Sequence, residues 1–197
     1  MLLRSSQLIG LPVMSLQTGA EIAYSVGLII NPDTLRIVAL ELDGENLDER
    51  PSFLRIEDVR ELSNIGFIVD SSDEFIGLED VISIKNLYDR NFQPIDMRVI
   101  DEHKHKLGKV YDMVFSTDTF IINQLCVKRP LFLSLGDTEL LINRTQIVDV
   151  REKDIVVRST ATKNKRPATV EKPTPLANPF KKPQNTPQPD TVSASDD

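Results

Sequence analysis

The sequence predicts a mainly β protein with two tandem small β-barrels, a short helix that joins them and a disordered C-terminal tail. Before residue 160 apolar and polar residues alternate almost everywhere with a period of two, which is typical of β-strands. The same order of strands and turns occurs twice. After Arg158 the alternation stops, and seven of the 12 prolines lie beyond Arg166. We therefore expect a first barrel at 1–76, a connecting segment at 77–90, a second barrel at 91–159 and a tail at 160–197.

A β-hairpin is predicted in the first half of the chain. Its first strand, residues 26–30, ends at the turn residues 31–34, where proline fixes φ and the Asn and Asp side chains accept local hydrogen bonds. Residues 35–42 are aliphatic with β-branched positions, which indicates the return strand. Shorter strands are expected at 53–56 and 66–69.

The second half repeats this order of strands and turns. A shift of 85 residues aligns the two hairpins, and three extra residues at 130–137 change the shift to 88 for the closing strands. Because apolar positions and turn residues agree in the same order, the pattern predicts an internal duplication. The aligned pairs are Asp33 with Asp118, Thr34 with Thr119, Ile37 with Ile122, Leu40 with Leu125, Leu42 with Val127, Val59 with Ile147, Leu62 with Val150, and Phe67 with Ile155.

Residues 78–87 change to the period of a helix. Val81, Ile84 and Leu87 fall on one face, and Tyr88 extends it. Acidic residues lie at the expected first turn, where the helix dipole favours them. We expect a short connecting helix whose apolar face packs on a barrel.

Composition limits the classes of function. The net charge is −7, and the tail from residue 160 carries +2, which leaves −9 for residues 1–159. An acidic body repels phosphate backbones, so we expect no broad nucleic-acid binding by the folded part. The single cysteine, Cys126, excludes an internal disulfide and is predicted to be a buried, inert thiol. No apolar run approaches the ~20 residues that a membrane span requires, and the sequence shows no signal peptide. We therefore expect a cytoplasmic protein with at most peripheral membrane contact.

Few residues are candidates for chemistry. His103 and His105 are the only histidines, and we interpret them as part of a solvated turn, because lysines flank them and oppose a metal cation. Residues 70–74 are interpreted as an exposed linker because they lack the spacing of a calcium loop. No nucleophile or phosphate-binding motif is present. We expect no catalytic residue, no metal site, no cofactor and no enzymatic activity.

The tail contains one candidate docking motif, in which an apolar anchor lies beside cations. Low-complexity sequence of the same composition is the alternative interpretation. The motif residues are Asn178, Pro179, Phe180, Lys181 and Lys182.

The second copy contains a glycine–lysine strand, an aspartate at its end, an Asp-containing turn and a closing pair of apolar strands. This order resembles the PRC-barrel family, the module of the photosynthetic reaction-centre H subunit and of the C-terminal part of the ribosome-maturation factor RimM. The first copy departs from it at residues 23–27, where AYSVG replaces the glycine–lysine strand. The resemblance implies a small closed barrel of roughly five or six strands without a channel. Its structural motif residues are Gly108, Lys109, Val110, Asp112, Asp118, Ile147, Asp33 and Val59.

The resemblance implies docking or assembly rather than catalysis. Our leading interpretation is a non-enzymatic adaptor or scaffold with a protein partner of unknown identity. One alternative is a ribosome or RNA-complex assembly factor that docks a ribosomal protein, and another is a peripheral subunit of a membrane complex. A small-molecule enzyme is a fourth interpretation. The analogies rest on fold, which does not fix function.

Overall fold

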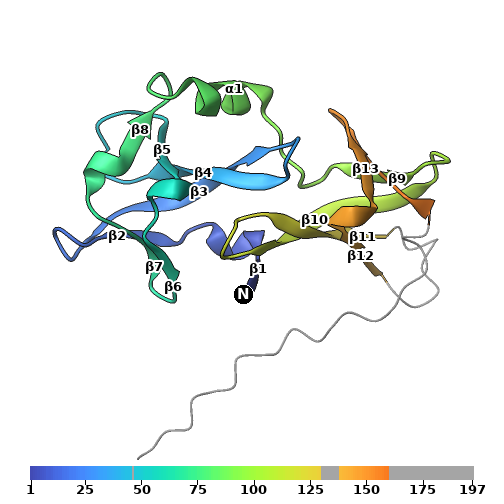
Figure 1. Ribbon diagram of the computed structural model, residues 1–197, viewed down its shortest axis with the longest axis horizontal. Coiled ribbons are helices and arrows are strands. Elements are labelled where there is room, and N and C mark those ends of the chain that lie inside the picture. Colours follow the sequence, from blue (N-terminus) through green and yellow to red (C-terminus); the bar gives the residue numbers. More distant parts are fainter. Residues whose placement is uncertain (46, 130–137, 160–197) are drawn as a thin grey trace, which may run out of the picture. The chain divides into compact units, whose positions relative to one another are not determined.

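The computed structural model describes residues 1–45, 47–129 and 138–159. They form two β-sheets and one α-helix (Figure 1), which confirms the mainly β prediction. We call residues 1–88 the first half and residues 89–159 the second half. The candidate docking motif at 178–182 and the predicted tail lie outside the described residues.

The sheet of the first half has the strand order β6-β7-β2-β3-β4-β5-β8. Neighbouring strands are antiparallel, except for the parallel pair β2 and β7. Its strands are β2 (Pro12–Ser15), β3 (Glu21–Asn31), β4 (Arg36–Asp43), β5 (Ser52–Arg55), β6 (Glu61–Ser63), β7 (Gly66–Val69) and β8 (Phe75–Gly77), and its 3-10 turns are Ser5–Leu8, Ile56–Asp58 and Ser72–Glu74.

The sheet of the second half has the order β12-β11-β10-β9-β14-β13 and the same senses of pairing, with β9 and β14 parallel. A further short strand, β1 (Leu2–Arg4), pairs with β10. The other strands are β9 (Arg98–Asp101), β10 (Lys106–Ser116), β11 (Ile122–Lys128), β12 (Glu139–Asn143), β13 (Ile147–Val150) and β14 (Asp154–Val157), with a 3-10 turn at Arg144–Gln146.

Irregularities of the long hairpins recur at the predicted offset of 85. The register shift between Val110 and Asp112 in β10 has its counterpart between Ser25 and Gly27 in β3. A second shift, at 114/115 in β10, recurs at 29/30 in β3. Bulges bend a strand at a defined position, so the two hairpins share their bends as well as their strand order.

The strands of each sheet form an open path in the part of the chain that the structure describes. The paths end at β6 and β8 in one sheet and at β13 and β12 in the other. The hydrogen-bonded ring of a closed barrel is therefore not seen. Each sheet instead encloses apolar side chains on its inner face, and one continuous cluster includes Leu40 and Phe67 of the first half and Phe115 and Leu125 of the second.

The connecting helix, α1, spans Ile82–Arg90 and begins later than the predicted residue 78. The backbone N–H of Gly77 donates to the Asp80 carboxylate at 2.7 Å, which holds the residues before the helix in a turn. The predicted apolar face does pack on a sheet, because Ile84 is buried in a separate cluster with Phe53. Within the described ranges, no helix has the length and apolar character that crossing a membrane requires.

One segment of the first half crosses to the second sheet. Strand β1 comes directly before the first sheet but pairs with β10 of the second. Helix α1, which follows β8, instead packs back on the first sheet against β3.

The turns of the two long hairpins also meet. Arg36 and Ile121, at equivalent positions, form an antiparallel β-bridge. Arginine side chains brace it from both sides: Arg36 Nε donates to the carbonyl of Thr119 at 3.0 Å, and Arg144 Nη2 donates to the carbonyl of Thr34 at 2.9 Å. We call this region, residues 34–37 with 119–122, the seam.

Candidate functional site

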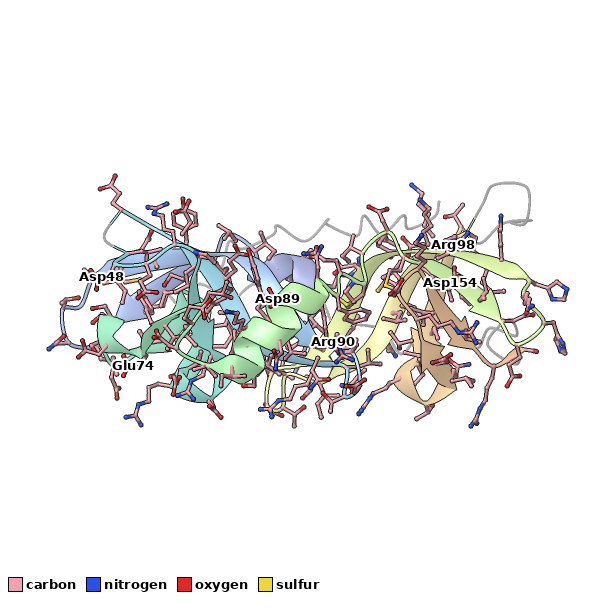
Figure 2. The ribbon with its side chains drawn as sticks, turned by 90° about the horizontal axis from the view of Figure 1, so that it is seen from above. Asp48, Glu74, Asp89, Arg90, Arg98 and Asp154 are labelled. Carbon is pink, nitrogen blue, oxygen red and sulfur yellow. The ribbon has the colours of Figure 1, made fainter. Side chains whose placement is uncertain are left out.

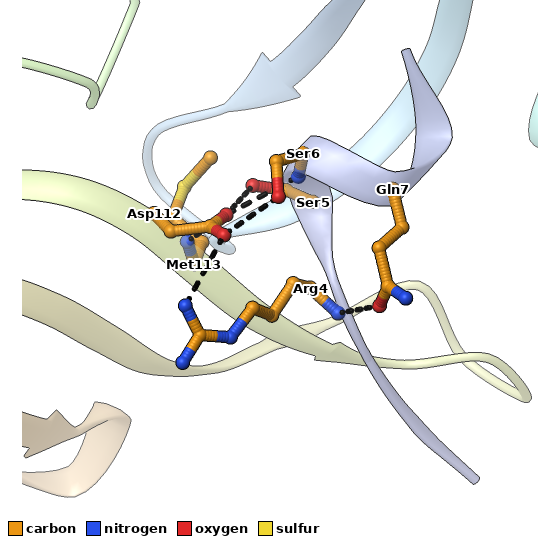
Figure 3. A network of polar contacts seen from close by, with 6 residues as sticks. All are labelled: Arg4, Ser5, Ser6, Gln7, Asp112 and Met113. Carbon is orange, nitrogen blue, oxygen red and sulfur yellow. Dashed lines mark hydrogen bonds and ion pairs between the residues drawn. The ribbon is translucent and has the colours of Figure 1, made fainter. Parts of the chain in front are cut away.

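The carboxylate of Asp112 is the centre of a polar network on β10 (Figure 3). The hydroxyls of Ser5 and Ser6 donate to its two oxygens at 2.9 and 2.7 Å, and the backbone N–H groups of Ser6 and Met113 donate to Oδ1 at 3.2 and 2.8 Å. Arg4 Nη1 lies 3.8 Å from Oδ2. The Asp112 side chain thus fastens the start of the chain to the second sheet.

Among the described residues 1–45 and 47–88, this network has no equivalent. Asp112 is buried, with 4% of its surface exposed, and Gly27 stands at the position 85 residues earlier. A buried carboxylate must be hydrogen-bonded to be tolerated, and Ser5, Ser6 and Met113 supply these hydrogen bonds. The geometry of Asp112 therefore fits a structural role rather than that of a general base.

Gly108 marks a close approach of two strands. A Cβ at this position would lie 2.2 Å from the carbonyl oxygen of Lys128 on β11. The motif glycine thus allows β10 and β11 to approach at the point where Lys109 follows. Lys109 itself is exposed.

Lys109 lies in the middle of a cross-strand row of cations. It pairs with Arg98 on β9 and with Lys128 on β11. A groove of about 510 Å³ opens beside the row, and Lys106 and Arg129 also line it. We call this feature the cationic groove. Arg98 at its edge forms an ion pair with Asp154 on β14, at 2.7 Å (Figure 2).

Charge is divided unevenly between the halves. Residues 1–88 contain six basic and fifteen acidic residues, a net of −9, whereas residues 89–159 contain eleven of each. The acidic excess of residues 1–159 is therefore confined to the first half, to which the labelled Asp48 and Glu74 belong (Figure 2). The sequence-based net charge of −9 for residues 1–159 is correct, but it did not locate the acidic excess in the first half or the cationic groove in the second.

Tyr111 lines the cationic groove, and Cys126 lies near Tyr111. Burial, then the charges of Cys126 and Glu139, raise the pKa of the Tyr111 phenol to about 12. The guanidinium of Arg4 lies 5.9 Å from the centre of the Tyr111 ring. Burial likewise raises the pKa of the Cys126 thiol, and Cys126 is fully buried, which confirms the predicted burial of this thiol.

His103 and His105 lie at the tip of the β9–β10 hairpin and are exposed, as the turn interpretation predicts. Asp101 accepts hydrogen bonds from the backbone N–H groups of both, at 2.9 and 2.8 Å, and contacts His105 Nδ1 at 2.9 Å. Burial opposes ionisation of Asp101, but the hydrogen bonds from His105 and His103 outweigh it and lower the pKa of the carboxyl. Among the described residues no group of three or more His, Cys, Asp and Glu could hold a metal ion.

The loop at 70–74 differs from the predicted exposed linker. Ser71 is buried and caps a 3-10 turn by accepting a hydrogen bond from the backbone N–H of Asp73 at 3.1 Å. The Ser71 N–H in turn donates to the Glu74 carboxylate at 2.9 Å. This local capping box needs only the spacing S-x-x-E, so the sequence carried a signal that the linker interpretation overlooked.

The remaining predicted motif residues are spread over the fold and form no common site. Asp33 lies in the first hairpin turn and contacts Arg90 at the end of α1, with 3.3 Å between the charged atoms. Asp118, in the second hairpin turn, is exposed and lies 3.5 Å from the N-terminal amine. Val59 and Ile147 are half-buried next to the 3-10 turns of the two sheets.

The sequence of the second half matches a known family model. Residues 89–163 match the model of the PRC-barrel domain. This part of the chain is therefore similar to PRC-barrel domains. The match covers every strand from β9 to β14 together with Gly108 and Asp112. No curated protein matches the chain.

Proposed function

We propose that the chain is a non-enzymatic adaptor that acts in the cytoplasm. Its two PRC-type barrels dock a protein partner. The tie between the halves carries this proposal: β1 crosses to the second sheet, and the two hairpin turns form a β-bridge between the halves. Such a tie would hold two interaction modules in one fixed arrangement, which an adaptor requires. The PRC-barrel is a general protein-interaction type of fold, and the second half matches its family model.

The first half is proposed as a second copy of the same module. Its six strands β2 to β7 have the order and senses of β9 to β14. Its long hairpin also carries the same two bulges. Bulges at matching positions are specific features of a strand pair, and they support duplication more strongly than low sequence identity alone.

A structural use of the buried polar groups supports a non-enzymatic role. Asp112 and Asp101 are the buried carboxylates of the described residues, and each accepts several hydrogen bonds from nearby backbone or side chains. A catalytic carboxylate must reach a proton of its substrate, whereas the oxygens of these two carboxylates are held by donors of the chain itself. The proposal therefore assigns these groups to stability.

The test is affinity capture of the tagged full chain from native lysate, followed by reconstitution with the purified partner. A complex of fixed stoichiometry that survives RNase supports the adaptor. Capture of ribosomal particles that RNase abolishes would overturn it in favour of an RNA-complex factor. Turnover of a small molecule by the purified chain would overturn the non-enzymatic role.

A further inference from the structure

We propose that the cationic groove on β9, β10 and β11 binds an acidic segment of a partner protein. This inference rests on the proposed adaptor function and names the surface that the adaptor uses. The groove is lined by the cations Arg98, Lys106, Lys109, Lys128 and Arg129, with Asp96 as its acidic member.

The strand register makes this arrangement unfavourable for the fold alone. Arg98, Lys109 and Lys128 are direct cross-strand neighbours, and like charges directly opposite each other destabilise a sheet. Asp154 offsets the charge of Arg98 at one end of the row. Lys109 has a cation on each side and forms no ion pair with any described residue. A bound carboxylate between the three cations would relieve this repulsion.

The equivalent row of the first half shows that the fold does not need these cations. Pro12, Tyr24 and Asp43 occupy the corresponding positions on β2, β3 and β4. There the Tyr24 hydroxyl donates to the Asp43 carboxylate at 2.9 Å. The same strand geometry is thus built with a neutral and acidic row in one half and with a cationic row in the other.

The composition of the groove suits a peptide segment. Its lining includes Val110 and Tyr111, and the aliphatic stems of lysine add apolar surface around their charged ends. An acidic segment with an apolar side chain would therefore meet both cations and apolar surface. Electrostatic complementarity of this kind gives specificity and speeds association.

The distribution of charge favours a short acidic segment over a nucleic acid. The first half carries a net charge of −9, and a long polyanion that extends beyond the groove would be repelled by it. Nucleic-acid binding depends on neutralising many successive phosphates, and the groove provides one compact cluster of cations. A protein segment can confine its negative charge to the length of the groove.

The experiment measures binding of a fluorescent peptide of Asp and Glu with one central Leu to the full chain by anisotropy. The variants are Lys109→Glu and Lys109→Gln, and the matched control is Lys153→Glu, an equal charge change at an exposed residue of the β13–β14 turn that does not line the groove. We expect Lys109→Glu to weaken binding about tenfold, or about 1.4 kcal/mol, Lys109→Gln to weaken it less, and Lys153→Glu to leave it within about twofold.

Thermal unfolding separates binding from folding. Because Lys109→Glu removes like-charge repulsion, its Tm should equal or exceed that of the wild type while peptide binding falls. Equal peptide binding by wild type and Lys109→Glu would overturn the assignment, and so would stronger binding of a single-stranded RNA oligomer that Lys109→Glu abolishes. If Lys109→Glu still captures the lysate partner, the adaptor stands and the groove assignment fails. If the wild-type chain captures no partner of fixed stoichiometry, the adaptor function is contradicted, whether or not the chain binds the peptide.

Discussion

Ile37 and Ile122 each donate a backbone N–H to the turn of the opposite half. The N–H of Ile37 lies 2.9 Å from the carbonyl oxygen of Phe120, and that of Ile122 lies 2.8 Å from the carbonyl oxygen of Leu35. The two acceptor residues are equivalent and share a left-handed backbone, with φ of 50° at Leu35 and 54° at Phe120. Bulky residues rarely adopt this conformation, and it persists where the surroundings over-determine it.

The two hydrogen bonds of Ile37 and Ile122 are related to each other as equivalent contacts are in a two-fold symmetric interface. In an isologous contact, residue i of one subunit meets residue j of the other and j meets i, and the seam has this pattern within one chain. Ile37 and Ile122 are fully buried, and Leu35 and Phe120 nearly so. The halves therefore share apolar core as well as hydrogen bonds, and neither can lose the seam without exposing apolar surface of the other.

We predict that truncating either seam isoleucine destabilises both halves together. Ile37→Ala and Ile122→Ala should each cost about 2–4 kcal/mol, because a fully buried aliphatic side chain is removed and a cavity remains. Guanidinium unfolding should stay a single transition, and native-state hydrogen exchange should quicken in β3 and β10 alike. Exchange that quickens only in the mutated half would contradict the shared core. Val148→Ala, at an exposed position, is the control with little expected change.

A second prediction concerns the carboxylate that fastens the start of the chain. Asp112→Ala leaves the hydroxyls of Ser5 and Ser6 and the N–H of Met113 without their acceptor, and unsatisfied buried donors cost about 1–3 kcal/mol each. We expect a loss of about 3 kcal/mol in the free energy of unfolding, measured in urea.

The matched control for this change is Asp118→Asn. Asp118 is also a predicted motif aspartate, but 79% of its side chain is exposed and its ion pair is with the terminal amine. Exposed ion pairs contribute roughly 0–1 kcal/mol, so stability should hardly change. Equal losses for the two variants would show that the Asp112 network does not stabilise the fold.

The pattern of apolar, polar and turn residues along the sequence predicted much of the fold, because strands and turns are specified by residues that are close together in the chain. The hairpins, their offset of 85 and the apolar face around Ile84 all follow from alternation, turn residues and helical spacing. The start of α1 was misplaced because Asp80 binds the Gly77 N–H and forms a turn, an alternative that acidic residues offer equally well.

The candidate site could not be predicted because it depends on contacts distant in the chain. Ser5 meets Asp112 across 107 positions, and three residues of β1 carry too little pattern to reveal that they cross to another sheet. Lys109 was identified only as part of a structural motif. Its place between two cations depends on the bulge in β10 and on the register with β9 and β11, which period alone does not fix.

A third prediction follows from the close approach at Gly108. Gly108→Ala would place a Cβ 2.2 Å from the carbonyl oxygen of Lys128, so β10 and β11 must separate. We expect a loss of about 2–3 kcal/mol, as for other overpacking changes, and faster amide exchange in β11. Gly19→Ala is the control, because Gly19 has φ of 65° and no atom within 4 Å of the added Cβ. Gly19→Ala should lower the free energy of unfolding by about 1 kcal/mol, from backbone strain alone. A Gly108→Ala cost no larger than that would contradict the steric argument.

A fourth prediction concerns the phenol of Tyr111 at high pH. Its pKa of about 12 lies above the ordinary value of 10.0, mainly because burial disfavours the phenolate. Between these two values the folded state holds the proton more tightly than the unfolded state, so the free energy of unfolding should fall as pH rises from 10 to 12. Below pH 10 the phenol is protonated in both states, and this contribution is fully present.

Tyr111→Phe isolates the effect. Phenolate absorbance of the wild type minus that of Tyr111→Phe should titrate with a midpoint near the pKa of about 12, which removes the signals of Tyr24 and Tyr88. The variant should also lose stability less steeply over the same range, since it has no phenol to ionise on unfolding. A difference titration centred near 10 would mean that the phenol is solvated like that of a free tyrosine, and it would contradict the burial of Tyr111 that raises its pKa in the structure.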